Sequence, residues 1–151
     1  MNTLSLEAQV RRLADLEELR QLKFNYARLV DKMLGEHTPA DEAALANVFT
    51  EDARADFGAR LGCIEGRAAI MKLFTETLPF SRSWFMHYVA NPVLAVEGDT
   101  ARGEWMVMAL TENRGGFGER GTVTGRYFDE YLRTPEGWRV SRQAFLDETR
   151  K

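Results

Sequence analysis

The sequence has little of what metal centres and disulfide-stabilised folds need. Cys63 is the only cysteine among 151 residues, so neither an internal disulfide nor a cluster of thiolate ligands can form. His37 and His87 are the only histidines and lie far apart in the sequence, which argues against a histidine metal site. We therefore expect a protein that works without a metal ion or another cofactor.

Long hydrophobic runs and an excess of positive charge are also absent. No segment approaches the roughly 18 consecutive apolar residues of a membrane span, and residues 1–7 lack the basic and apolar stretches of a secretion signal. The net charge is −3, so no strong field attracts nucleic acid or an anionic membrane surface. We expect a cytoplasmic protein whose partners include neither nucleic acid nor a membrane.

The apolar pattern changes its period partway along the chain. Helical spacing predicts a long helix over residues 6–34 and shorter helices over 40–49 and 67–78, the last ending before Pro79. Alternation predicts strands over residues 53–57, 84–89, 93–96, 101–110, 122–131 and 138–146. Turn signals separate these strands, including Asn91-Pro92 and a glycine cluster over 115–121 that we interpret as a hairpin loop. Helices followed by hairpin-linked strands predict one α+β domain spanning residues 1–151, with helices on one face of an antiparallel sheet.

Three residues carry chemistry that such a domain could use without a cofactor. Tyr26 and Asp31 lie on the long predicted helix, and His87 lies on the face of its strand that alternation assigns to apolar side chains. A histidine beside a carboxylate can remove a proton from a substrate. Five helical steps place Tyr26 and Asp31 roughly 140° apart, so we expect the helix to end near Asp31 if its carboxylate is to reach His87.

Each of these residues also has a purely structural interpretation. Asp31 could be a solvated residue at the helix end or could pair with Lys32 or Arg28, while Tyr26 could pack in the core and His87 could be a satisfied interior residue. A carboxylate at the negative end of a helix dipole nevertheless breaks a local rule. Such exceptions mark candidates for function.

Short motifs follow one another along nearly the whole chain. They occupy residues 16–22 before Tyr26 and Asp31, then 49–53, 66–67, 87–91, 98–101, 125–131 and 137–140. Their order and spacing resemble the SnoaL-like group of the nuclear-transport-factor-2-like (NTF2-like) superfamily. The resemblance implies a cone-shaped α+β domain in which a curved antiparallel sheet packs on three N-terminal helices and encloses a pocket, with dimers or trimers common.

The same resemblance implies roles for the three residues. Similar enzymes of the family, namely scytalone dehydratase, bile-acid 7α-dehydratase and hexachlorocyclohexane dehydrochlorinase, use an Asp–His pair, joined in the first two by a tyrosine. Asp31 would be the carboxylate of the pair, His87 the base and Tyr26 the hydrogen-bond donor. The implied activity is that of a cofactor-independent, dehydratase-like lyase acting on a small hydrophobic polycyclic or aromatic-like substrate.

Large side chains supply candidates for the wall of the pocket. They are Phe49, Phe57, Phe85, Trp105 and Phe145. The related lyases use an arginine on the final strand, for which Arg142 is the nearest counterpart, although a one-residue shift in register decides whether it faces the pocket. Two other functions stay open: an isomerase or polyketide-cyclase-type enzyme with the same base, or a non-catalytic ligand-binding or assembly domain.

Overall fold

A computed structural model describes residues 4–59, 61–115 and 119–149 of the chain. The helical elements are α1 (Leu6–Met33), α2 (Pro39–Ala46), α3 (Arg67–Lys72), the π-helical turn η1 (Leu73–Thr77) and α4 (Leu78–Ser81). The strands are β1 (Phe49–Asp56), β2 (Cys63–Glu65), β3 (Arg82–Glu97), β4 (Thr100–Asn113), β5 (Arg120–Thr134) and β6 (Gly137–Asp147).

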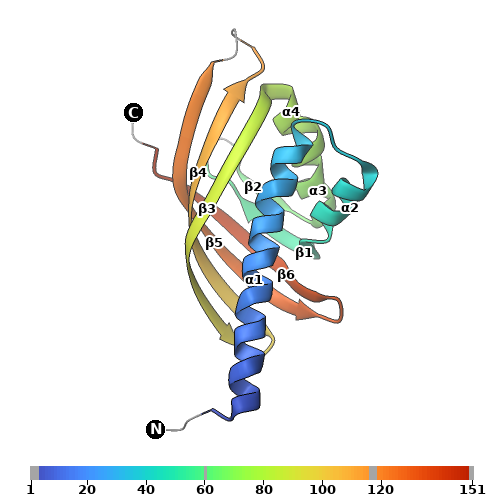
Figure 1. The fold of residues 1–151 in the computed structure, drawn as a ribbon. Helices are drawn as coiled ribbons and strands as arrows, with labels where there is room; N and C mark the ends of the chain where they lie inside the picture. The colour runs from blue at the N-terminus through green and yellow to red at the C-terminus, as the bar shows by residue number, and fades with distance from the viewer. Residues whose placement is uncertain (1–3, 60, 116–118, 150–151) are drawn as a thin grey trace.

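The six strands form one curved, unclosed sheet in the order β2-β1-β6-β5-β4-β3, and the helices cover its concave side (Figure 1). This is the α+β fold of the NTF2-like type that the sequence predicted. All neighbouring strands are antiparallel except β1 and β6, which are parallel. The parallel pair and the short strand β2 were not predicted.

Two predicted boundaries were wrong for local reasons. The third helical segment continues past Pro79. In η1 the hydrogen bonding shifts, so that the Leu78 N–H donates to the Leu73 carbonyl. Pro79 consequently falls in the first turn of α4, where its missing N–H is tolerated. Residues 84–89 and 93–96 belong to one strand, β3, which continues through Asn91 and Pro92 with a shift in register instead of turning. As an edge strand, β3 can accept a proline.

The first turns of α1 extend beyond the sheet (Figure 1). Leu6, Val10 and Leu13 are consequently exposed, although their spacing suggested core packing. The C-terminal half is buried against the sheet through residues such as Leu19 and Val30. No helix within the described residues is long and apolar enough to cross a membrane.

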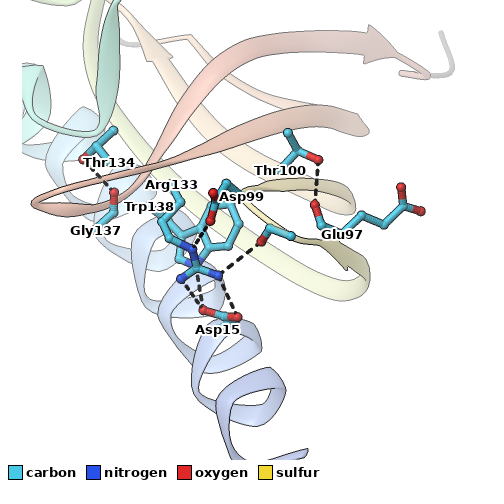
Figure 2. Close-up of polar contacts among 9 residues, drawn as sticks. Asp15, Glu97, Asp99, Thr100, Arg133, Thr134, Gly137 and Trp138 are labelled. Atoms are coloured by element: carbon cyan, nitrogen blue, oxygen red, sulfur yellow. Dashed lines mark hydrogen bonds and ion pairs between the residues drawn. The ribbon is translucent and has the colours of Figure 1, made fainter. Parts of the chain in front are cut away.

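A polar cluster fastens the middle of α1 to the far end of the sheet (Figure 2). Asp15 accepts two hydrogen bonds from the Arg133 guanidinium, at 2.7 and 2.9 Å, and one from the Trp138 indole N–H at 3.1 Å. Arg133 also donates to Asp99 at 3.0 Å and stacks over the Trp138 ring. The cluster therefore joins α1, the helix that carries Tyr26 and Asp31, to the β3–β4 and β5–β6 turns.

Candidate active site

Asp31 and His87 meet directly, although they are 56 residues apart in the sequence. His87 Nδ1 lies 2.5 Å from Asp31 Oδ1, and the backbone N–H of His87 donates to Asp31 Oδ2 at 3.0 Å. The side chain of His87 is 7% exposed and that of Asp31 is 23% exposed. Because Nδ1 faces the carboxylate as a donor, Nε2 is the ring nitrogen left to accept a proton.

The fold explains how a helix and a strand supply these two partners. β3 is an edge strand, so one side of its backbone has no neighbouring strand, and the carboxylate of Asp31 occupies that side at His87. α1 ends at Met33, two residues after Asp31, which agrees with the expectation that the helix ends nearby. The helix does not unwind between Tyr26 and Asp31, since Asp31 reaches His87 from beside the cavity while Tyr26 lines the cavity itself.

A cavity of about 470 Å³ lies between the sheet and the helices next to His87. Aromatic and aliphatic side chains form most of its wall. These include Val30, Phe57, Leu73, Phe74, Leu78, Phe85, Val107 and Phe145. Its polar side chains are Tyr26, Ser81, Arg82, His87, Tyr127 and Asp147. A small hydrophobic compound with one or two polar groups matches this volume and lining.

Tyr26 is 1% exposed and contacts Phe49, Phe74 and Tyr127 edge to face, with ring centroids 5.9 to 6.0 Å apart. Burial raises the pKa of the Tyr26 phenol well above its usual value, and the neighbouring Tyr127 phenol raises it further. The hydroxyl therefore keeps its proton at neutral pH and can act as a donor. Tyr26 is thus both a core residue and part of the cavity wall.

The five large side chains offered as wall candidates divide into two groups. Phe57, Phe85 and Phe145 line the cavity, and the Phe85 ring lies edge-on to the His87 ring at 5.3 Å. Phe49 and Trp105 are fully buried but do not line it. Phe49 begins β1 instead of ending the predicted helix and stacks on Phe74, and the Trp105 indole donates to the Tyr131 hydroxyl at 2.9 Å. The size of a side chain made these two candidates but does not show its depth in the fold.

Arg142 does not reach the cavity. Its side chain is exposed on the outer face of the sheet, and the next residue, Gln143, points inward and is fully buried. The expectation that Arg142 binds substrate here is therefore corrected by the strand register, which pairs Arg142 with Glu130 on β5.

Sequence reasoning missed Tyr127 and Phe74 in the cavity wall and a buried ion pair beneath it. Lys23 Nζ donates to Asp129 Oδ2 at 2.7 Å, and both side chains are 0% exposed. Lys23 was not singled out, because its sequence neighbourhood shows no partner for its charge. Strand alternation offered a signal for Asp129, because it shares the inward face of β5 with Tyr127 and Tyr131.

Among the described side chains, no group of three or more His, Cys, Asp and Glu residues could hold a metal ion. The chemical groups at the cavity include a histidine with a carboxylate partner and two phenols, set in a largely apolar wall.

A curved sheet wrapped over helices, with an Asp–His pair at a cavity on its concave side, defines an α+β domain of the NTF2-like superfamily. The chain belongs to the SnoaL-like family within it, since the model of the SnoaL-like domain matches residues 11–144. A curated relative, an uncharacterised protein of Mycobacterium tuberculosis, is 30% identical over 138 residues, which are 89% of this chain and 86% of the relative.

Solved structures include several neighbours with known or assigned activities. A protein from Novosphingobium aromaticivorans, provisionally named an aromatic ring hydroxylase, is 32% identical with a TM-score of 0.79 over 91% of this chain and 92% of that one. Hexachlorocyclohexane dehydrochlorinase LinA-type3 from Novosphingobium barchaimii is 22% identical with a TM-score of 0.81, and the match covers 93% of this chain and 91% of that one. A protein from N. aromaticivorans provisionally named scytalone dehydratase is 20% identical with a TM-score of 0.78, over 91% and 87%. The last two likenesses, at such low identity, show the fold alone.

Proposed function

We propose that the protein is a cofactor-independent, dehydratase-like lyase in which His87 is the general base. The contact of 2.5 Å between Asp31 Oδ1 and His87 Nδ1, beside an open apolar cavity, is the observation that carries this proposal. A carboxylate on Nδ1 fixes the orientation of the imidazole and stabilises the imidazolium that forms when Nε2 takes a proton. The two contacts that Asp31 makes with His87 hold the imidazole ring in a fixed orientation before a substrate arrives.

The proposed reaction begins with a proton on a carbon next to a carbonyl group. His87 Nε2 takes that proton, and the electron pair of the broken C–H bond moves toward the carbonyl oxygen, where Tyr26 donates a hydrogen bond. The electrons then form a C=C bond as the C–O bond to a β-hydroxyl group breaks. The hydroxyl leaves as water after receiving the proton from His87, which restores the neutral base.

The lining of the cavity supports a hydrophobic ring compound as the substrate. Phe57, Phe74, Phe85 and Phe145 offer ring faces and edges, while His87 and the two tyrosines supply polar groups to the same cavity. A volume of about 470 Å³ accommodates a compound of two or three fused rings.

Turnover of a panel of bicyclic and tricyclic β-hydroxyketones tests the proposal. Mass spectrometry measures loss of water, and incubation in D₂O measures deuterium uptake next to the carbonyl. We expect His87→Gln and Asp31→Asn each to lower kcat by roughly 10²- to 10⁴-fold, the usual contribution of a general base. His37→Gln is the matched control, because His37 lies in the α1–α2 loop and does not line the cavity.

A His87→Gln variant that retains the wild-type rate would contradict the proposed base. Deuterium uptake without loss of water would instead identify an isomerase or cyclase that uses the same base. Binding of ring compounds without either change would identify a ligand-binding domain.

We also propose that the protein is a homo-oligomer in the cytoplasm. The face of β3, β4 and β5 opposite the helices carries exposed Met86, Tyr88, Met106, Met108 and Phe128, and none of the described segments covers it. An apolar face of this kind can pair with the same face of a second copy across a two-fold axis. Light scattering should show an oligomer that Met108→Glu dissociates. A wild-type monomer would refute the assembly, and cell fractionation checks the location.

A further inference from the structure

A charged pair with no access to water lies directly beneath the cavity. Lys23 Nζ is 2.7 Å from Asp129 Oδ2, and both side chains are 0% exposed. Asp129 Oδ2 accepts a second hydrogen bond from the Tyr131 hydroxyl at 2.8 Å. Burying two charges is costly even when they are paired, and an apolar pair of similar volume often serves the fold equally well. The position of this pair therefore calls for an explanation beyond stability.

The ammonium group of Lys23 lies under the ring of Tyr127. The distance from Lys23 Nζ to the ring centroid is 3.7 Å, which is a cation–π contact, and the distance to the Tyr26 centroid is 4.8 Å. The Tyr127 ring is also held at its sides, because it is perpendicular to the Tyr26 ring at 6.0 Å and tilted against Phe145 at 5.3 Å. Three neighbours thus fix a single orientation for this ring.

Tyr127 is buried against the protein and yet lines the same cavity as Tyr26 and His87. Burial raises the pKa of the Tyr127 phenol, and the negative charges of Asp129 and Asp31 raise it further, against the opposing effect of Tyr26. The hydroxyl consequently keeps its proton at neutral pH. A fixed, protonated phenol in the same cavity as the base is suited to donate a hydrogen bond to an oxygen atom of a ligand.

We propose that Tyr127 is a second catalytic phenol of this site, which together with Tyr26 binds the carbonyl oxygen of a ring ketone, and that the Lys23–Asp129 pair positions its ring from below. This inference rests on the proposed lyase function and names its substrate class. When His87 Nε2 takes the proton from the neighbouring carbon, the electron pair moves to the carbonyl oxygen. The negative charge on that oxygen then faces two hydroxyl donors, and no oxidant or reductant takes part.

Tyr127→Phe tests this role, and Tyr88→Phe is its control. Both changes remove one phenol hydroxyl, but Tyr88 is exposed on the outer face of β3 and does not line the cavity. For deuterium exchange into a bicyclic ketone, we expect Tyr127→Phe to lower kcat by roughly 10²- to 10³-fold, the usual effect of losing one oxyanion donor. KM should change by less than about threefold, because the hydrogen bond strengthens as charge develops. Tyr88→Phe should retain a kcat within about threefold of the wild type.

Equilibrium binding gives a measurement that does not depend on turnover. Naphthol and naphthalene have the same ring system, and only naphthol carries an oxygen. Wild-type protein and Tyr88→Phe should prefer naphthol by roughly fivefold or more, the effect of at least one net hydrogen bond, and Tyr127→Phe should lose roughly fivefold of this preference. Lys23→Met combined with Asp129→Leu should remain folded and lose part of the preference, because the ring is then held less firmly.

The outcomes separate this inference from the proposed function. Equal kcat values and equal naphthol preferences for Tyr127→Phe and Tyr88→Phe would overturn the role of Tyr127, and so would a wild-type preference near one. Loss of the preference in Tyr127→Phe alone would uphold the contact of Tyr127 with oxygen even if no ketone were turned over. In that case the lyase function would fail while the binding role stood.

Discussion

Replacing Asp15 by asparagine should weaken the fold by an amount that the polar cluster of Figure 2 allows us to estimate. The Asp15 carboxylate accepts three hydrogen bonds and its side chain is 8% exposed. Asparagine keeps the shape but has a single acceptor oxygen, so one of the two bonds from the Arg133 guanidinium is lost, and hydrogen bonds to charged groups contribute roughly 1.5–3 kcal/mol each. Because Arg133 is partly exposed and retains Asp99, we expect a loss of about 2–3 kcal/mol in the free energy of unfolding. The melting temperature should fall by about 4–12 °C for a domain of this size.

The difference in free energy of unfolding between wild type and Asp15→Asn should decrease as the pH falls. Hydrogen bonding from Arg133 is the largest cause that lowers the pKa of Asp15 below its ordinary value of 3.8, with a smaller contribution from Trp138 and with burial opposing. A carboxyl group with a lowered pKa in the folded state stabilises the protein above its ordinary pKa. That contribution is lost as the pH falls through the folded-state value. The difference in free energy of unfolding between wild type and Asp15→Asn should therefore be largest at pH 7 and should decrease below about pH 4.

Urea denaturation followed by circular dichroism, at several pH values, measures both quantities. Asp99→Asn is the matched control, because Asp99 binds the same guanidinium but its side chain is 84% exposed. It should cost only a small fraction of the Asp15 effect. Equal losses for the two variants, or a gap for Asp15→Asn that stays constant down to pH 3, would refute the reasoning.

Two further changes test the interior. Lys23→Met alone leaves the Asp129 carboxylate buried without its cation and should cost roughly 3–5 kcal/mol by urea denaturation, whereas adding Asp129→Leu should recover most of that loss. A recovery of less than half would mean that the pair itself stabilises the fold. Gly125→Ala would place a Cβ atom 2.1 Å from the carbonyl oxygen of Leu146, so we expect a loss of at least about 1–3 kcal/mol as β5 and β6 separate locally. Gly121→Ala, also on β5, meets nothing closer than 3.2 Å and should change the melting temperature little; similar effects for both glycines would contradict the steric argument.

The sequence was most informative where a residue broke a local rule. Asp31 at the negative end of a helix and His87 on an apolar face were both singled out, and the structure brings them into contact. Helical geometry also indicated correctly that Tyr26 and Asp31 point in different directions. No local pattern could show that the edge of β3 passes beside the end of α1, since that contact depends on the whole topology.

The sequence could not show how deep a side chain lies in the fold or which residues pair between neighbouring strands. Trp105 and Phe145 both lie on inward faces, but only the sheet curvature decides which of them reaches the cavity. Arg142 and Gln143 exchange faces with a one-residue shift in strand pairing, which only the completed sheet fixes. The Lys23–Asp129 pair could not be predicted, because its two members lie 106 residues apart in the sequence.

The π-helical turn η1 gives this fold a simple way to vary its ligand preference. Leu73 and Phe74 within the turn and Leu78 just after it all face the cavity. Deleting one residue between positions 73 and 77 would restore α-helical spacing and rotate α4 by roughly 100° about the helix axis. Leu78 and Ser81 would then leave the cavity wall, while Asp31 lies before the turn and His87 is held in β3 by the pairing with β4. The gain or loss of one codon here would thus change the wall of the cavity and leave the Asp31–His87 pair intact.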